Sequence, residues 1–395
     1  MHDNKDISFK KLVDAIHQQA QAALDDPYVF KRPIKDVAVI GAGAHGLCSA
    51  RHLKEVGMHV KVFERNSSVG GLWKYSATPP LKPKVPTDCI TSEYDNLDKY
   101  FLKDPKNFAF PDFPFSEGTP AFTTHENVLA YFERYTDTFR LLPLIEFDTS
   151  VDQVIKAAEG SWELALSEYK RYPNGFIRET KWRERFDAVV AALGMHQVPF
   201  IPDLKSLAEY NKLWPKKVMH SKQVSGVDIA RSLEGFAKSI TISIKGPFVS
   251  LNPIDNVLRQ LIPKDAAIKP VIASFSNPDR KVDSSITFED GSVMKEVDQV
   301  IFCTGYSLSL GYMKQLVIKD NQQSTKEGLS YADVPEGHVV LGPKSPLNVY
   351  HDTFCFVSMP RFFSLSPYFD IQAKTIARVW SNNMHIPSRE KNASN

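Results

Sequence analysis

Two glycine-containing stretches hold the residues of this sequence that could do chemistry. Residues 37–47 read VAVIGAGAHGL, a short apolar run followed by a complete G-x-G-x-x-G loop. Residues 220–233 read HSKQVSGVDIARSL and contain only the later part of such a loop. Glycines at this spacing let backbone N–H groups approach the pyrophosphate of a dinucleotide, and the dipole of the following helix favours the anion. The sequence therefore predicts one whole nucleotide site and one incomplete site.

The first loop has the flanking elements that a dinucleotide site needs. Gly41 permits the tight turn, Gly43 the close approach of the ligand, and Gly46 the close packing of helix against strand. Glu64 ends the next predicted strand, where a carboxylate can bind ribose hydroxyls. Because strand, helix and acid are all in place, we interpret this region as a dinucleotide site. The alternative is a glycine-rich structural turn.

The run from Val62 to Trp73, VFERNSSVGGLW, resembles the class B flavin-dependent monooxygenases. These are the flavin-containing monooxygenases and their Baeyer–Villiger relatives. In that family the first glycine loop binds FAD and the GGLW segment lies along the flavin. The resemblance therefore implies that Gly71, Leu72 and Trp73 contact FAD, although Trp73 could also be a plain core aromatic residue.

Three later segments are also similar to this family, so the resemblance spans most of the chain. They are FDAVVAALG at 186–194, VIFCTGY at 300–306, and FDIQA at 369–373 leading into the last predicted helix. The second of these resembles the family's F-A-T-G-Y motif, which implies that Thr304 and Gly305 lie at a cofactor. The alternative is that these two residues simply end a buried strand.

The second loop departs from the family pattern. In the family a second fingerprint, G-x-G-x-S-G followed by x-D-I-A, binds NADPH. Here Ser225, Gly226 and Asp228 match its later part, but only three residues separate Ser225 from Ser221. A complete unit takes roughly 30 residues, so the preceding strand and the first two glycines are missing. Lys245 stands where the family places a basic residue for the 2′-phosphate, and it could equally be a solvent-exposed lysine.

Losing a central strand has physical consequences. Such a strand is normally buried on both faces, so we expect Ile229, Leu233, Ile240 and Ile242 to become exposed. The segment could have been lost by splicing or gene modelling. Alternatively the protein is a genuine relative that no longer uses NADPH in the usual way. The clean return to the family pattern at Ser225 favours a discrete loss.

One further candidate is Asn96, in the sequence SEYDNL at 92–97. The family has an asparagine near the flavin in a short T-N motif, and here Asp95 replaces the threonine. The resemblance thus makes Asn96 the candidate catalytic residue. Asp-Asn pairs also favour turns, so Asn96 could instead be a turn residue. We predict neither a catalytic triad nor a metal site.

The composition limits the binding partners and the cellular location that we expect. The net charge is +2, from 48 basic and 46 acidic residues among 395, with no long single-sign run. This predicts no nucleic-acid partner and no anionic membrane partner. Four scattered cysteines without metal-ligand spacing, and a polar N-terminal sequence, predict a reduced, cytoplasmic protein. No apolar run reaches the ~18 residues of a membrane helix.

We therefore expect an α/β fold with a Rossmann-like FAD domain and an inserted, incomplete NADPH domain. The predicted boundaries are 1–32 for an N-terminal helical extension, with its helix at Phe9 to Leu24, 33–202 and 331–395 for the FAD domain, and 203–330 for the NADPH domain. Within 33–202, the segments 151–166, 176–177 and 186–192 predict strands of a small sheet.

The resemblance implies an FAD-dependent, NADPH-using monooxygenase. Such an enzyme inserts one oxygen atom from O2 into a small nitrogen- or sulfur-containing substrate or a ketone, through a flavin hydroperoxide. The alternative function is a flavin-binding pseudoenzyme, or inactive isoform, that lacks a competent NADPH site.

Overall fold

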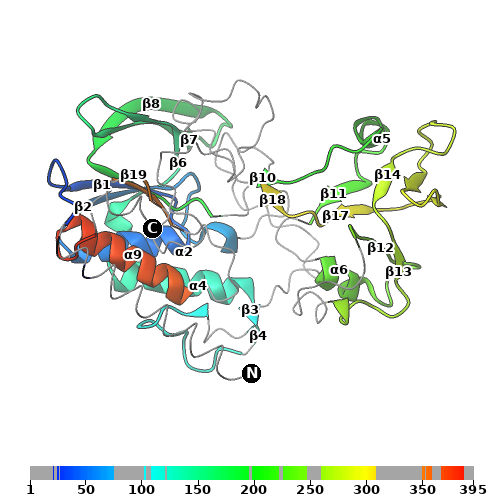
Figure 1. Cartoon of the computed structure of the whole chain (residues 1–395), viewed down its shortest axis with the longest axis horizontal. Coiled ribbons are helices and arrows are strands. Elements are labelled where there is room, and N and C mark those ends of the chain that lie inside the picture. Colours follow the sequence, from blue (N-terminus) through cyan, green and yellow to red (C-terminus); the bar gives the residue numbers. More distant parts are fainter. Residues whose placement is uncertain are drawn as a thin grey trace. The chain divides into compact units, whose positions relative to one another are not determined.

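The chain forms two compact units, seen in the computed structural model in Figure 1. Unit 1 contains residues 1–93, 99–195 and 309–395, and unit 2 contains 94–98 and 196–308. The structure describes residues 21, 25, 27–74, 102–103, 108–120, 122–194, 198–221, 226–246, 259–307, 349–351, 353–357 and 366–386. Most of the predicted helix at 9–24, Asn96 and Ser225 lie outside the described residues.

Unit 1 is built on a six-stranded sheet. Its strands, in spatial order, are β19 (Val349–His351), β20 (Phe354–Phe356), β9 (Ala188–Ala191), β1 (Asp36–Ile40), β2 (His59–Phe63) and β5 (Ile145–Glu146). All neighbours are parallel except β19 and β20. The central strands are almost wholly apolar and buried, as expected for a parallel sheet covered on both faces. This confirms the predicted α/β class.

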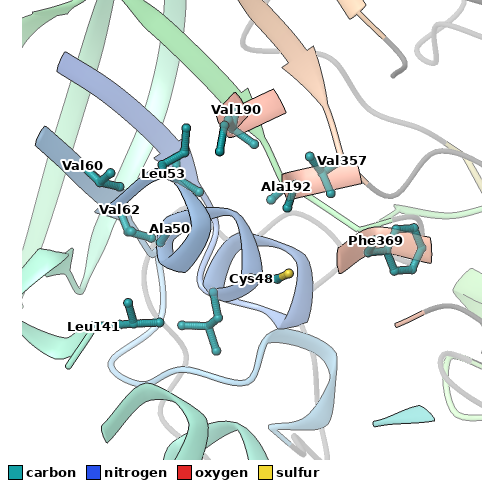
Figure 2. Close-up of a cluster of buried hydrophobic side chains, with 14 of the residues drawn as sticks. Cys48, Ala50, Leu53, Val60, Val62, Leu141, Val190, Ala192, Val357 and Phe369 are labelled. Atoms are coloured by element: carbon teal, nitrogen blue, oxygen red, sulfur yellow. The ribbon is translucent and has the colours of Figure 1, made fainter. Parts of the chain in front are cut away.

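Three longer helices accompany this sheet: α2 (Ala44–Glu55), α4 (His125–Thr138) and α9 (Ser366–Trp380). Helix α2 packs against β1, β2 and α9, so the last described helix of the chain lies on the first helix of the sheet (Figure 1). Leu53 of α2, Val62 of β2 and Val190 of β9 lie in one buried cluster (Figure 2). Shorter elements are β3 (Leu102–Lys103), β4 (Phe122–Thr123) and the 3-10 helices η1 (Gly71–Trp73) and η2 (Leu142–Leu144).

Unit 1 also contains an antiparallel meander of β6 (Thr149–Lys156), β7 (Trp162–Arg171) and β8 (Ile177–Phe186). The prediction that 186–192 belongs to this small sheet is wrong for most of that segment. Phe186 ends β8, but β9 enters the main sheet between β1 and β20. Asp187 marks the change, because its carboxylate accepts the backbone N–H groups of Lys35 and Asp36 at 2.9 and 3.0 Å. Four consecutive buried apolar residues then suit a central parallel strand.

Unit 2 consists of short elements. Its helices are α5 (Leu207–Leu213) and α6 (Gly226–Leu233), and its strands are β10 (Val198–Pro199), β11 (Val218–His220), β12 (Thr241–Ser243), β13 (Ala267–Lys269), β14 (Ile272–Ser274), β15 (Ile286–Phe288), β16 (Val293–Met294), β17 (Val300–Phe302) and β18 (Tyr306–Ser307). Within its described residues these strands form four separate sheets: β10 with β18, β11 with β17, β12 with β13, and β14 to β16. Its buried core comprises Tyr210, Phe275, Ile286, Phe288, Val300 and Phe302.

The four aliphatic residues of unit 2 that we expected to be exposed to solvent are partly exposed. None of Ile229, Leu233, Ile240 and Ile242 is fully buried, and in α6 only Ala230 is, among the residues whose side chains are described. Phe236, just after α6, is 89% exposed. Over the described parts of the chain, no helix is long and apolar enough to cross a membrane.

Candidate functional site

The glycine loop lies at the carboxyl end of β1, and its geometry requires glycine, which has no side chain, at two positions. Gly41 has φ +100, a conformation that glycine adopts without strain, and its N–H donates to the Phe63 carbonyl at 2.8 Å. A Cβ atom on Gly46 would lie 1.8 Å from the Gly41 carbonyl oxygen. Because that neighbour is backbone, no side-chain movement could relieve the clash. The first turn of α2 is therefore pressed directly against the loop.

The start of α2 is open to an anion. Its N-cap is Gly43, which offers no side-chain cap, and the first turn contains no acidic residue. The first N–H groups of a helix have no partner inside it, and they carry the positive end of the helix dipole. This helix end is therefore suited to a pyrophosphate.

Glu64 holds the loop from the neighbouring strand. Its carboxylate accepts the N–H of Ala42 at 2.7 Å and the N–H of Asn66 at 2.9 Å. The residue is only 4% exposed, and this burial raises the pKa of the Glu64 carboxyl, while the two backbone N–H groups oppose the rise. A carboxylate has about four lone-pair sites, so further acceptor capacity remains for ribose hydroxyls.

The GGLW segment lies against the glycine loop. The N–H of Gly70 donates to the Ala42 carbonyl at 3.0 Å. A Cβ on Gly71 would lie 3.0 Å from the Cα of Gly43, so the two glycine segments touch. Leu72 is 40% exposed, whereas Trp73 is half-buried and packs edge-on against Phe108 with ring centroids 5.4 Å apart. The structure thus brings the predicted residues of unit 1 to one place, and Trp73 also has the core contact of the alternative interpretation.

Helix α9 adds two residues that were not predicted as site residues. The ring of Phe369 meets the ring of His45, inside the glycine loop, edge-on with centroids 3.8 Å apart. Gln372 is 1% exposed, and neither polar atom of its amide has a hydrogen-bond partner. Buried amides normally have one, so Gln372 is available to a ligand or a water molecule. The signals in the sequence were the histidine within G-A-H-G and the glutamine of FDIQA.

The predicted residues of unit 2 have mainly structural contacts. Gly226 begins α6, and a Cβ there would lie 3.1 Å from the Cβ of Cys303. The Thr304 hydroxyl donates to the Phe200 carbonyl, and the Gly305 carbonyl accepts the Phe200 N–H at 2.9 Å. These bonds join the segments that contain β10 and β18. Lys245 is exposed after β12, and the side chain of Asp228 is not described.

Taken together, the described residues of unit 1 fit an adenine dinucleotide. A Cβ on Gly41 or Gly46 would clash with backbone, the N-cap Gly43 brings no side chain to the helix start, and Glu64 has acceptor capacity at the end of the second strand. These are the features by which a βαβ unit binds such a cofactor.

Comparisons with known proteins identify the family. The family model described as flavin-binding monooxygenase-like matches residues 34–233 and 254–394. The flavin-containing monooxygenase FMO GS-OX-like 8 of Arabidopsis thaliana is 30% identical over 396 residues, covering 92% of this chain and 78% of its own. The flavin-containing monooxygenase iboF of Amanita muscaria (strain Koide BX008) is 24% identical, covering 92% and 82%.

Solved structures share the fold. The S-allyl-L-cysteine S-oxygenase from Allium sativum superposes with a TM-score of 0.63 at 24% identity, over 91% of this chain and 79% of its own. The open crystal structure of cyclohexanone monooxygenase gives a TM-score of 0.56 at 16% identity, over 92% and 91%. These matches confirm the predicted resemblance and the two-domain flavoprotein fold. The chain belongs to the flavin-binding monooxygenase-like family, and it is a flavin-dependent oxidoreductase of the monooxygenase class.

Proposed function

We propose that unit 1 binds FAD and that the protein is an NADPH-using monooxygenase. The observation that supports FAD binding most directly is the Cβ-free contact of Gly46 with Gly41, beside the buried carboxylate of Glu64. When bound, the flavin supplies the redox and oxygen-transfer chemistry. The chain's own residues bind, orient and shield it.

Each residue has a distinct part in this proposal. The N–H groups at the start of α2 bind the pyrophosphate, and Glu64 accepts hydrogen bonds from ribose hydroxyls. Leu72 and Trp73 would contact the flavin and exclude water from it, as the family resemblance implies. Asn96, Ser225, Gly226, Lys245, Thr304 and Gly305 remain candidates by resemblance, the first for the flavin and the others for NADPH or the junction.

Small nucleophilic substrates with nitrogen or sulfur, or ketones, are the substrates that we propose. The sulfur class comes first, because a structural relative is named an S-allyl-L-cysteine S-oxygenase, and ketones follow from the fold shared with cyclohexanone monooxygenase. A screen should therefore begin with thioethers, continue with tertiary amines and end with cyclic ketones.

A specific observation favours a second candidate, a flavin-binding protein that NADPH does not reduce. In the described part of unit 2, β12 and β17 belong to different sheets, and α6 begins beside Cys303. A dinucleotide cradle needs its glycines between strand and helix, as in unit 1, whereas the segment between β11 and α6 lacks the first two of them. That arrangement supports weak NADPH binding or none.

The deciding experiment mixes FAD-loaded protein with NADPH without oxygen and follows the visible flavin absorption. Rapid bleaching is the result expected of the monooxygenase, and NADH serves as the comparison donor. If NADPH leaves the absorption intact while dithionite bleaches it, the second candidate holds. If the purified protein takes up no FAD at all, both candidates fail.

We also propose a cytoplasmic location. The three cysteines that the structure describes, Cys48, Cys303 and Cys355, are all free thiols, which suits a reducing compartment. Cell fractionation of a tagged protein would test this.

A further inference from the structure

A buried polar cluster lies between α2 and α9, and the proposed cofactor site does not use it. It consists of Cys48 and His52 on α2 and Asp370 on α9, which are 0%, 4% and 7% exposed. One donor atom from each residue lies within 4.8 Å of the other two. Figure 2 shows the Cys48 sulfur on the side of α2 that faces the segment carrying Phe369. Sulfur, nitrogen and oxygen donors thus meet inside an otherwise apolar core.

The distances between the donor atoms suit a metal ion with tetrahedral coordination. Cys48 and His52 are four residues apart, so they lie on one face of α2. The Cys48 Sγ lies 3.6 Å from Asp370 Oδ1, and His52 Nε2 lies 2.7 Å from the same oxygen. Zinc bonds of about 2.0–2.3 Å place neighbouring donors about 3.3–3.8 Å apart. The sulfur–oxygen distance already fits, and the nitrogen–oxygen pair must open by roughly 0.6 Å, a small movement of one carboxylate.

The second ring nitrogen of His52 has the partner that metal-bound histidines have. His52 Nδ1 lies 3.2 Å from Glu55 Oε2. A carboxylate on that nitrogen fixes a proton there, and the proton that Nε2 shares with Asp370 Oδ1 would leave when a metal binds. Glu55 is itself held by Arg51, whose Nε donates to its other oxygen at 2.8 Å.

The charges also balance. A thiolate, a carboxylate and a neutral imidazole carry two negative charges, which a divalent cation neutralises. Without a cation, the Cys48 thiol donates a hydrogen bond to Asp370 Oδ1 at 3.6 Å. Metal binding would release this proton, as it does at other thiolate sites. The remaining charges nearby are paired, because Arg51 also binds Asp112 at 2.5 Å.

We propose that Cys48, His52 and Asp370 bind a zinc ion that fastens α9 to α2. A borderline-soft divalent ion is the class that such mixed donors select. The competing account is a metal-free cluster held by the hydrogen bond between His52 and Asp370.

The test uses the full-length protein, stripped with a chelator and titrated with Co²⁺ as a spectroscopic substitute for zinc. We expect a thiolate-to-cobalt charge-transfer absorption that saturates at one ion per chain and disappears when zinc is added. Cys48→Ser should abolish this absorption and lower zinc affinity at least tenfold. The matched control is Cys303→Ser, which removes an exposed thiol outside the cluster and should leave the absorption unchanged.

Several results would overturn the proposal. One is the absence of a stoichiometric charge-transfer absorption in the unsubstituted protein, which needs no variant. Another is an absorption that survives Cys48→Ser or vanishes in Cys303→Ser. Should Cys48→Ser fail to fold, Asp370→Asn replaces it, and unchanged zinc affinity in that variant would exclude Asp370 as a ligand. Glu55→Gln should weaken zinc binding about 10–100-fold, as the loss of an outer-shell partner does.

Discussion

The glycine loop of unit 1 and the corresponding segment of unit 2 begin helices in different surroundings. In unit 1 the loop follows β1, which pairs with parallel strands on both sides, and α2 packs against that strand. In unit 2, α6 forms from the retained S-G-x-D-I-A pattern, yet the adjacent described sheets contain two strands each. A strand, β11, does precede α6 and pairs in parallel with β17, but the first two glycines of the fingerprint are absent between β11 and α6, so the helix forms without a complete cofactor loop.

The two units also differ in how much core supports them. The main cluster of unit 1 includes four central residues of β1 and β2, Val37, Val39, Val60 and Val62, that are at most 8% exposed. The described core of unit 2 has six buried residues: Tyr210 lies on α5, and the others lie on or next to strands of three residues or fewer. Regions with few buried apolar contacts open first. Unit 2 should therefore lose its hydrogen-exchange protection at lower denaturant concentration than unit 1.

Substitution in the glycine loop should have the largest effect. Gly46→Ala places a Cβ 1.8 Å from the Gly41 carbonyl, so we expect a destabilisation of at least about 3 kcal/mol and complete loss of FAD binding. Gly43→Ala is the matched control in the same loop, because its Cβ would meet nothing closer than 3.7 Å. That variant should keep the stability of the apoprotein and lose only FAD affinity. Thermal unfolding and flavin fluorescence measure the two quantities, and equal destabilisation by both variants would contradict the geometry.

Replacing one buried phenylalanine in each unit tests whether the core of unit 2 is the less stable of the two. Phe275 in unit 2 and Phe354 in unit 1 are both 0% exposed. Each change to alanine should cost about 3–5 kcal/mol. Because the core of unit 2 is small, Phe275→Ala should remove the hydrogen-exchange protection of that unit and leave FAD binding intact. Phe354→Ala should weaken FAD binding and leave the hydrogen-exchange protection of unit 2 intact. Identical exchange patterns in the two variants would mean that the two units unfold together.

Glu64→Gln should have an intermediate effect, with a distinct pH dependence. Burial raises the pKa of Glu64 in the folded apoprotein, so the stability that this group contributes declines as pH rises from about 4.5 through the raised pKa. The variant should lack this decline, and it should bind FAD about tenfold more weakly, since a hydrogen bond to a charged group is lost.

The control for Glu64 is the exposed Glu117, where the same substitution should change neither property. Thermal unfolding of the apoproteins between pH 4 and 8 provides the comparison. A Glu64→Gln profile parallel to that of the unsubstituted protein would contradict a raised pKa.

The smallest effect is expected at Phe236 in unit 2. This side chain is 89% exposed, so Phe236→Ser should change the free energy of unfolding by no more than about 0.5 kcal/mol. Chemical denaturation followed by tryptophan fluorescence suffices. A larger loss of stability would show that another surface covers Phe236 in solution. The difference in buried apolar core between the two units would then be smaller.

Local patterns were enough to predict much of unit 1. The strand at Val37, the glycine loop and Glu64 lie within 30 residues of one another, and each has a sequence signal of its own. Helix α2 begins within the glycine loop itself, at Ala44. The placement of β9 was wrong because sheet membership depends on partners, here β1 and β20, that are distant in sequence.

Contacts between distant segments were the least predictable part of the sites. The edge-on contact of His45 with Phe369 and the cluster around Asp370 join residues more than 300 positions apart. Cysteine spacing alone did not reveal that cluster, since its histidine and aspartate are unremarkable in sequence. In unit 2, Ile229 and Ile242 are partly exposed as expected, but the prediction that no strand precedes this helix was wrong, because β11 ends at His220 and pairs with the distant β17.

The order of strands in unit 1 also bears on how the chain is made. β20 and α9 join a sheet whose other parallel strands are all finished by Ala191. At 5–20 residues per second, a ribosome needs roughly 10–30 s to make the chain between these parts. During that interval α2 and one edge of β9 are without their final neighbours, so the nascent protein presents apolar surface to chaperones. A nonsense mutation between β9 and β20 would leave this surface uncovered permanently.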